Sequence, residues 1–283
     1  MEVEGVCTTL HLFFFIRSNP LLRLGIHDFL NASPLLLLLK EKGPDLGFQI
    51  VTDSPAALAD RLNSGDLDLA MIPSVEYLKS ADNYRLIPNI CIASRGPVRT
   101  VLLLAKKPIS EITSIAADIR SRTSVALLKI LFPFTDNLSI HPFPPDPESM
   151  LAEHPAALII GDPAFKLNKL SSDITVYDLS EEWFKQTGKP FVHAVLAVSE
   201  KVTLNKNQKN LFQIARVQGY RRIKEIVSNY KNLPDVENAV LEDYLENKIK
   251  YNLDDEGIDG LNHFINLCYQ NGVISKKIFI RFI

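Results

Sequence analysis

The sequence predicts a two-lobed α/β protein with a ligand cleft between the lobes. Short apolar runs alternate with helix-start signals over residues 21–200, and this order predicts mostly parallel sheets with helices on their faces. The 283 residues are enough for two domains of ordinary size. A late apolar run at 192–198 would lead the chain back to the first lobe. Two crossings between lobes make a hinge.

The first lobe follows from short apolar runs that fit buried strands. Strands are expected at 22–26, 48–53 and 66–72. A Ser or Pro that opens an apolar periodic segment is a helix-start signal. Helices are therefore expected to begin at Ser33-Pro34, Ser54-Pro55 and Pro73-Ser74.

The second half continues this pattern and then changes. Further strands are expected at 89–94, 98–105, 115–117, 138–141, 157–160, 174–177 and 192–198, with a helix from Ser121 to about Leu131. After residue 200 the periodicity becomes helical, apolar on one face and charged on the other. Three helices are expected, at 204–230, 236–251 and 258–270. We therefore expect an N-terminal extension at 1–20, a first lobe at 21–105 with 196–283, and a second lobe at 106–195.

Composition excludes several classes of protein. Lys and Arg number 31 against 33 Asp and Glu, a net charge of −2, so no nucleic-acid partner is indicated. The longest N-terminal apolar run, 10–16, is far too short for a membrane span, and Glu2 and Glu4 do not suit a secretory signal. Three cysteines without CxxC spacing, Cys7, Cys91 and Cys268, are typical of reduced thiols. We expect a cytoplasmic protein.

Motifs for common cofactors are absent from the sequence. It contains no GxGxxG, GxxxxGK[ST], GxSxG or HExxH, and its six histidines have no ligand spacing. We therefore predict neither a metal nor a cofactor. Four polar loops that follow expected strands remain as candidate ligand contacts.

Each of these loops has a functional and a structural interpretation. Asn31 and the Ser121–Ser124 run lie at helix starts, where backbone N–H groups attract anions, but both could simply cap those helices. In the second loop, Ser94, Arg95 and Gly96 could bind a carboxylate or form an ordinary turn. In the fourth, Gly161-Asp162 follows a strand, where ligand-facing residues collect, or Asp162 caps the next helix.

Taken together, the loops are more specific than any one of them. The segments LGIHDFLNASPL, SGDLDLAMIPSVEYL, IASRGPVRTVLL, SRTSVALLKIL, LIIGDPAF and YDLSEEWFKQTGKPFVHAVLA resemble, in this order, the chorismate dehydratase (MqnA) family of the futalosine route to menaquinone. The resemblance covers about residues 22–200, and the C-terminal helices only by pattern. It implies a periplasmic-binding-protein-like fold of type II, with two crossovers and a central cleft.

The resemblance also implies an activity. It implies loss of water from chorismate to give 3-[(1-carboxyvinyl)oxy]benzoate, without a metal or redox cofactor. Asn31 and Ser94 would hold the enolpyruvyl side chain, and Asp162, beside Gly161, would orient the substrate or help the hydroxyl leave. Gly96 and the helix start at Thr123 and Ser124 would bind carboxylate oxygens. The proton acceptor stays open, since a substrate carboxylate could serve.

One departure from the family and two alternative functions remain. His193 and Leu196 stand where the family more often has Phe and Trp, so His193 is either a hinge residue or a changed part of the cleft wall. The fold is more often that of a binding protein than of an enzyme, so a non-catalytic solute-binding or sensor protein is the main alternative. The sister dihydroxynaphthoate synthase shares the fold but not the FLNASP or SRGPV pattern.

Overall fold

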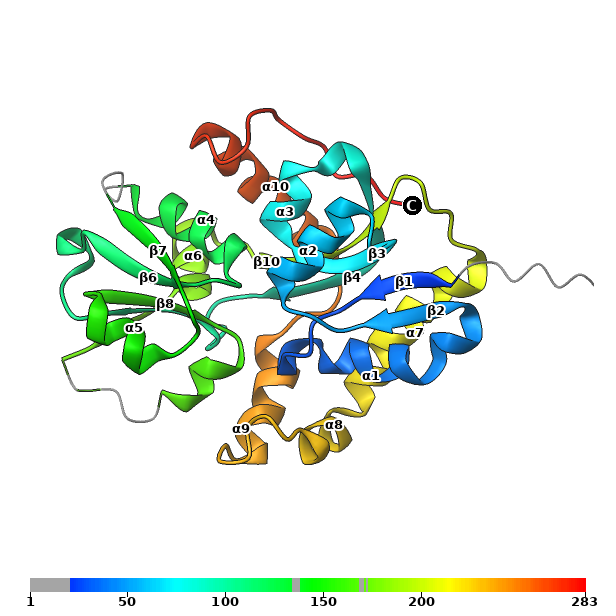
Figure 1. Cartoon of the computed structure of the whole chain (residues 1–283), viewed down its shortest axis with the longest axis horizontal. Helices are drawn as coiled ribbons and strands as arrows, with labels where there is room; N and C mark the ends of the chain where they lie inside the picture. Colours follow the sequence, from blue (N-terminus) through cyan, green and yellow to red (C-terminus); the bar gives the residue numbers. More distant parts are fainter. Residues whose placement is uncertain (1–20, 134–137, 168–170, 172) are drawn as a thin grey trace, which may run out of the picture.

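The computed structural model describes residues 21–133, 138–167, 171 and 173–283 (Figure 1). The predicted extension at 1–20, with Cys7, lies outside these residues. Two mixed five-stranded sheets organise the described chain, one in each lobe. The predicted two-lobed α/β fold is confirmed.

The first sheet has the order β2-β1-β3-β10-β4. In it β1 pairs in parallel with β2 and β3, whereas β10 runs antiparallel to β3 and β4. Its strands are β1 (Leu22–Gly25), β2 (Phe48–Val51), β3 (Leu69–Pro73), β4 (Tyr84–Ser94) and β10 (Phe191–Ser199). The second sheet has the order β7-β6-β8-β5-β9. Its strands are β5 (Val101–Ala105), β6 (Ser114–Asp118), β7 (Ser139–Phe143), β8 (Ala156–Ile160) and β9 (Thr175–Asp178).

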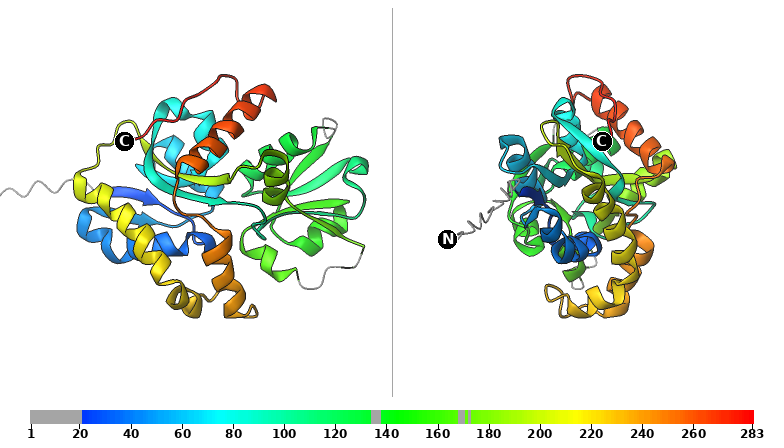
Figure 2. Two further views of the ribbon diagram at one scale, coloured as in Figure 1. Left: turned by 180° about the vertical axis from the view of Figure 1, so that it is seen from behind. Right: turned by 90° about the vertical axis from the view of Figure 1, so that its right-hand side faces the viewer.

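Helices cover both sheets. On the first sheet, α1 and α7 pack together on one face, and α2, α3 and α10 lie on the other (Figures 1 and 2). The first lobe contains α1 (Ser33–Lys42), α2 (Pro55–Ser64), α3 (Ser74–Lys79), α7 (Lys206–Arg221), α8 (Ile223–Asn229), α9 (Asn238–Asp243) and α10 (Asp255–Gln270). The second contains α4 (Arg122–Leu131), α5 (Pro147–Glu153) and α6 (Leu179–Thr187). Among the described residues, no helix is both long and apolar enough to cross a membrane.

The chain crosses between lobes twice, and the sheets place both crossings earlier than the predicted boundaries. It leaves the first sheet after Ser94 and enters the second at Val101; it returns between the end of α6 and Phe191. All of β5 therefore belongs to the second lobe and all of β10 to the first. The predicted limits at 105 and 195 fall at or inside these strands because each apolar run continues past its crossing.

One carboxylate ties the first crossing to the start of α6. Asp178 Oδ2 accepts hydrogen bonds from the backbone N–H groups of Val98 and Arg99, at 2.8 and 2.7 Å. Its Oδ1 accepts from the N–H groups of Ser180 and Glu181 and so caps α6. Burial raises the pKa of Asp178. The loop after Ser94 and the start of α6 are therefore held at fixed positions relative to each other.

Two sequence expectations about helices need correction. The helix expected at 204–230 is divided into α7 and α8 at Arg222. The helix expected at 236–251 ends as α9 and continues as a π-helix, Tyr244–Lys248. In α7, a Cβ on Gly219 would lie 1.8 Å from the carbonyl oxygen of Pro34, so α1 and α7 approach too closely for any side chain there. Such contacts between distant segments are not visible in local periodicity.

Candidate active site

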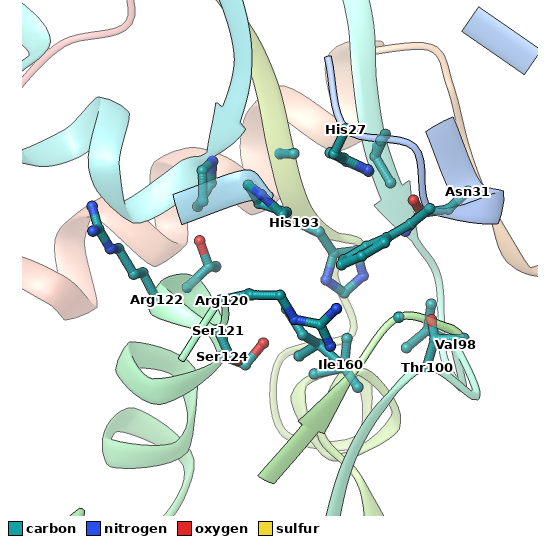
Figure 3. Close-up of a pocket in the computed structure, with 18 residues that line it drawn as sticks. His27, Asn31, Val98, Thr100, Arg120, Ser121, Arg122, Ser124, Ile160 and His193 are labelled. Atoms are coloured by element: carbon teal, nitrogen blue, oxygen red, sulfur yellow. The ribbon is translucent and has the colours of Figure 1, made fainter. Parts of the chain in front are cut away.

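A pocket lies between the two lobes, where the polar loops converge (Figure 3). The space between its lining side chains, with open solvent at the mouth included, is about 560 Å³. Its walls come from the loop after β1, the first crossing, the start of α4, the end of β8, and β10. Both lobes therefore contribute to one shared site.

The start of α4 is the wall of the pocket that is best suited to bind an anion. No side chain of the described residues caps this helix, so capping does not account for the hydroxyls at its start. Ser121 Oγ is buried without a hydrogen-bond partner among the described residues, and Ser124 also lines the pocket. Thr123 lines it too, while its Oγ1 accepts a hydrogen bond from the N–H of Val75 in the first lobe, at 3.2 Å. Free N–H groups and the helix dipole would attract a carboxylate here.

Two arginines line the pocket, but acidic residues already bind both. Arg120 donates to both Asp118 oxygens, at 2.8 and 2.6 Å, and its guanidinium lies over the Phe29 ring, 4.8 Å from the centroid. Arg122 donates to Asp60 at 2.7 Å and to Glu76 at 3.1 Å, and the hydrogen bond to Asp60 raises its pKa. We call Arg122, Asp60 and Glu76 the arginine clasp, because it joins α4 to α2 and α3 of the other lobe.

The loop after β1 brings Asn31 to the pocket. Asn31 lies in a short 3-10 turn, Leu30–Ala32, and Ala32 rather than Asn31 occupies the cap position of α1. Asn31 Oδ1 is buried and has no hydrogen-bond partner in the described part of the chain. Beside it, the Tyr244 hydroxyl hydrogen-bonds Thr100 at 2.8 Å. An unpaired buried polar atom on a pocket wall favours the ligand-binding interpretation of Asn31.

Two histidines line the pocket as neutral rings. Burial lowers the pKa of His27 to about 4 and that of His193 to about 4. His27 is only 3% exposed, and its Nδ1 has no partner among the described residues. At neutral pH each ring therefore carries a single proton, and each offers one donor and one acceptor nitrogen.

Ser94 lies behind His193 rather than on the pocket wall. Its side chain is fully buried, and its Oγ is 2.8 Å from His193 Nε2 and 2.5 Å from Ser180 Oγ. His193 lines the pocket, whereas Ser94 does not. Of the two interpretations of His193, the structure therefore supports the cleft wall, and it places this ring between Ser94 and any ligand.

Arg95 and Gly96 point away from the pocket. The Arg95 guanidinium lies 3.4 Å from Glu256 and over the Phe184 ring, and its side chain is half exposed. Gly96 has φ +81°, a left-handed conformation that glycine adopts without strain, and it turns the chain into the first crossing. Neither residue lines the pocket, so the structural interpretation of this loop fits better.

Gly161 and Asp162 lie where the end of β8 meets the first lobe. Gly161 lines the pocket at φ +68°, and a Cβ there would lie 2.8 Å from the Phe29 ring. Asp162 does not line it; its Oδ1 accepts from the N–H of Leu30 at 3.1 Å, and its Oδ2 accepts from the Tyr230 hydroxyl. Burial raises the pKa of Asp162. We call Asp162, the Leu30 N–H and Tyr230 the aspartate clasp.

The structure thus separates the eight predicted site residues into two groups. Four line one pocket: Asn31, Thr123, Ser124 and Gly161. Four do not: Ser94, Arg95, Gly96 and Asp162. Sequence reasoning missed several lining residues: His27, Thr100 and Arg120. Their only signal was position, since His27 directly follows a predicted strand and Arg120 comes three residues after another.

Within the part of the chain that the structure describes, no group of three or more His, Cys, Asp and Glu side chains lies close enough together to hold a metal ion. Cys91 and Cys268 are buried free thiols, and burial raises the pKa of Cys268 to about 12 and that of Cys91 still further. These thiols are therefore structural.

Fold and pocket together define a class: two-lobed proteins with the periplasmic-binding-protein type of fold and a pocket between the lobes. Solved structures agree. A protein of Archaeoglobus fulgidus has a TM-score of 0.71 at 16% identity, covering 89% of this chain and 98% of its own. The periplasmic aliphatic sulphonate binding protein of Escherichia coli has a TM-score of 0.59 at 14% identity, covering 92% and 95%. At these identities the similarity shows the fold alone.

Sequence comparison identifies the family within that class. The family described as menaquinone biosynthesis matches residues 22–270, and the chain belongs to it. A relative from Thermus thermophilus, named chorismate dehydratase, is 29% identical over 256 residues, which are 85% of this chain and 93% of the relative. The family match confirms the resemblance seen in the loops and extends it over the C-terminal helices.

Proposed function

We propose that this protein is a chorismate dehydratase, a carbon–oxygen lyase of the futalosine route to menaquinone. The observation that carries the proposal is the pocket between the lobes, whose walls offer unpaired donors and acceptors and an uncapped helix start. Family membership and the name of the Thermus thermophilus relative supply the reaction. No other function is favoured by a specific feature of the pocket.

The proposed reaction removes one water from chorismate. The C–H bond beside the ether breaks, the neighbouring hydroxyl leaves, and the new double bond makes the ring aromatic in 3-[(1-carboxyvinyl)oxy]benzoate. Aromatisation makes the reaction downhill, so the protein mainly has to hold a flexible dianion in the reactive conformation. A site built from fixed polar groups is suited to that task.

The walls suggest which part of the dianion each binds. One carboxylate would lie at the start of α4, near Ser121 and Ser124, where N–H groups and the dipole are least compensated. Asn31 would contact the enolpyruvyl side chain from the opposite lobe. The ring would lie between these ends, against Phe29 and Ile160. Closure of the two clasps would exclude water from the bound substrate.

The test is turnover of chorismate by the purified protein without an added cofactor. Formation of the carboxyvinyloxybenzoate, followed by chromatography and absorbance, is the expected result. Asn31→Ala should lower kcat/KM about tenfold to a hundredfold with little change in melting temperature. Chorismate that raises the melting temperature but gives no product would contradict the proposal and indicate a binding protein or sensor.

A further inference from the structure

His193 occupies an irregular position on β10. The register between β10 and β4 shifts between Val192, paired with Ala93, and Ala194, paired with Ile92. His193 is the extra residue at this bulge. Bulges interrupt pairing and redirect a side chain, and they are frequent beside active sites. Here the bulge directs the imidazole to Ser94 on the neighbouring strand and into the pocket, where Figure 3 shows it among the lining side chains.

The hydroxyl pair behind this ring has a defined direction. Within the described residues, Ser94 Oγ is the only hydrogen-bond partner of Ser180 Oγ, and Ser180 is 1% exposed. If Ser94 donated to Ser180, the Ser180 hydrogen would be buried without an acceptor, which is costly. Ser180 therefore donates to Ser94, and the Ser94 hydrogen is left for its other partner, His193 Nε2.

This direction selects the tautomer of His193. A nitrogen that accepts a hydrogen bond carries no proton, so the proton of a neutral imidazole must lie on Nδ1. The low pKa that burial gives this ring agrees with a single proton. His193 Nδ1 has no partner in the described part of the chain, and the ring is partly exposed on the pocket wall.

We propose that Ser180, Ser94 and His193 form a directed chain of hydrogen bonds that presents Nδ1–H of His193 to the pocket as the donor for a ligand oxygen. His193 is then the specificity-determining contact, and Ser94 is a positioning residue that acts through it. The donor selects a carboxylate or ether oxygen and disfavours a group that can only donate. The role in turnover rests on the proposed dehydratase function, whereas the hydrogen-bond chain does not.

The tautomer is tested on the ligand-free protein by ¹⁵N NMR of the histidine rings. His193→Asn identifies the His193 signals by their loss. A proton on Nδ1 and a bare Nε2 are expected in the wild type, and Ser94→Ala should shift protons towards Nε2 because it removes the donor. A proton on Nε2 in the wild type would overturn the proposal. This outcome does not depend on whether chorismate is the substrate.

The positioning role is tested by a double-mutant cycle on kcat/KM for chorismate. Ser94→Ala is expected to lower kcat/KM about tenfold in the wild type but less than about twofold in a His193→Phe background, because its effect passes through the imidazole. Equal losses in both backgrounds would show that Ser94 contacts the substrate directly and would overturn the proposal.

Rescue by a conservative variant separates a contact from a packing effect. The amide N–H of His193→Asn occupies the place of Nδ1–H, whereas the amide of His193→Gln reaches the place of Nε2. His193→Asn should retain several-fold more kcat/KM than His193→Gln or His193→Phe, at similar melting temperatures. The opposite order would assign the contact to Nε2 and contradict the proposal. A wild type that does not turn over chorismate would defeat the proposed function and leave the NMR result standing.

Discussion

The two clasps join the same lobes through different interactions, one through hydrogen bonds to a buried carboxylate and the other through ion pairs. In the aspartate clasp, a carboxylate with a raised pKa accepts hydrogen bonds from two neutral donors, the Leu30 N–H and the Tyr230 hydroxyl. In the arginine clasp, one guanidinium pairs directly with two carboxylates, and the Asp60 side chain is 64% exposed. Exposed ion pairs contribute little, whereas a buried donor left without its acceptor is costly. We therefore predict that the aspartate clasp, with the contact between Gly161 and Phe29 beside it, contributes more than the arginine clasp to holding the lobes closed.

The largest effect is expected where β8 touches Phe29. Gly161→Ala forces a side chain at φ +68° and places its Cβ 2.8 Å from the Phe29 ring. Strain and overpacking together should lower the free energy of unfolding by about 3 kcal/mol, measured by urea unfolding. Gly188→Ala is the matched control, because its φ is +69° but nothing lies within 4 Å; it should cost about 1 kcal/mol. Equal losses in the two variants would show that the contact with Phe29 adds nothing to the cost of Gly161→Ala.

Asp162→Ala breaks the aspartate clasp itself. It leaves the Leu30 N–H without its acceptor, whereas the Tyr230 hydroxyl keeps the Asp28 carbonyl oxygen, 3.1 Å away, so the free energy of unfolding should fall by about 2 kcal/mol. Asp162→Asn keeps one acceptor oxygen and should lose less. Small-angle scattering of the ligand-free protein should show a larger radius of gyration for Asp162→Ala. An unchanged radius and stability would mean that the arginine clasp suffices.

His27, which packs beside Phe29 on the same side of the cleft, should make stability depend on pH. Its folded pKa of about 4 lies below its unfolded value of 6.5, so between these values the unfolded chain binds the proton. Stability is then complete above pH 6.5 and falls as the pH drops towards 4. From pH 7 to pH 5 the contribution of His27 amounts to about 2 kcal/mol.

Urea unfolding at pH 7 and pH 5 measures this loss. His27→Leu should remove it, so the difference between the two pH values becomes smaller than in the wild type. A His27→Leu variant with the wild-type difference would show that His27 is not held neutral.

The smallest effect is expected in the arginine clasp. Asp60→Asn removes one exposed partner of Arg122 and leaves Glu76 in place. The free energy of unfolding should change by less than about 0.5 kcal/mol, and even this difference should disappear in high salt. A loss as large as that of Asp162→Ala would reverse the ranking of the two clasps.

The architecture was predictable from sequence, because alternating strand and helix signals are local. The predicted lobe limits, 105 and 195, lie after both crossings, because each limit was placed within or at the end of the apolar strand that follows a crossing. Trp183 is fully buried against Phe191 and Phe264.

The site was only partly predictable, for a physical reason. Asn31 and Gly161 follow strand ends, where ligand-facing residues of α/β folds collect. The position of Ser94 depends on the register between β4 and β10 and on the bulge at His193. The sequence of one strand does not show how it is aligned with the neighbouring strand. The sequence could not show that Asp162 lies outside the pocket, because its hydrogen-bond partner Tyr230 is 68 residues away.

Trp183 lies at the contact between the two lobes. It is the only tryptophan of the chain, it belongs to α6 in the second lobe, and its ring stacks edge-on against Phe191 and Phe264 of the first. Its indole N–H donates to the Pro190 carbonyl at the second crossing. Rotation of one lobe against the other alters the surroundings of this ring. The tryptophan fluorescence of the unlabelled protein should therefore report the opening of the lobes, and it can be followed in a stopped-flow instrument.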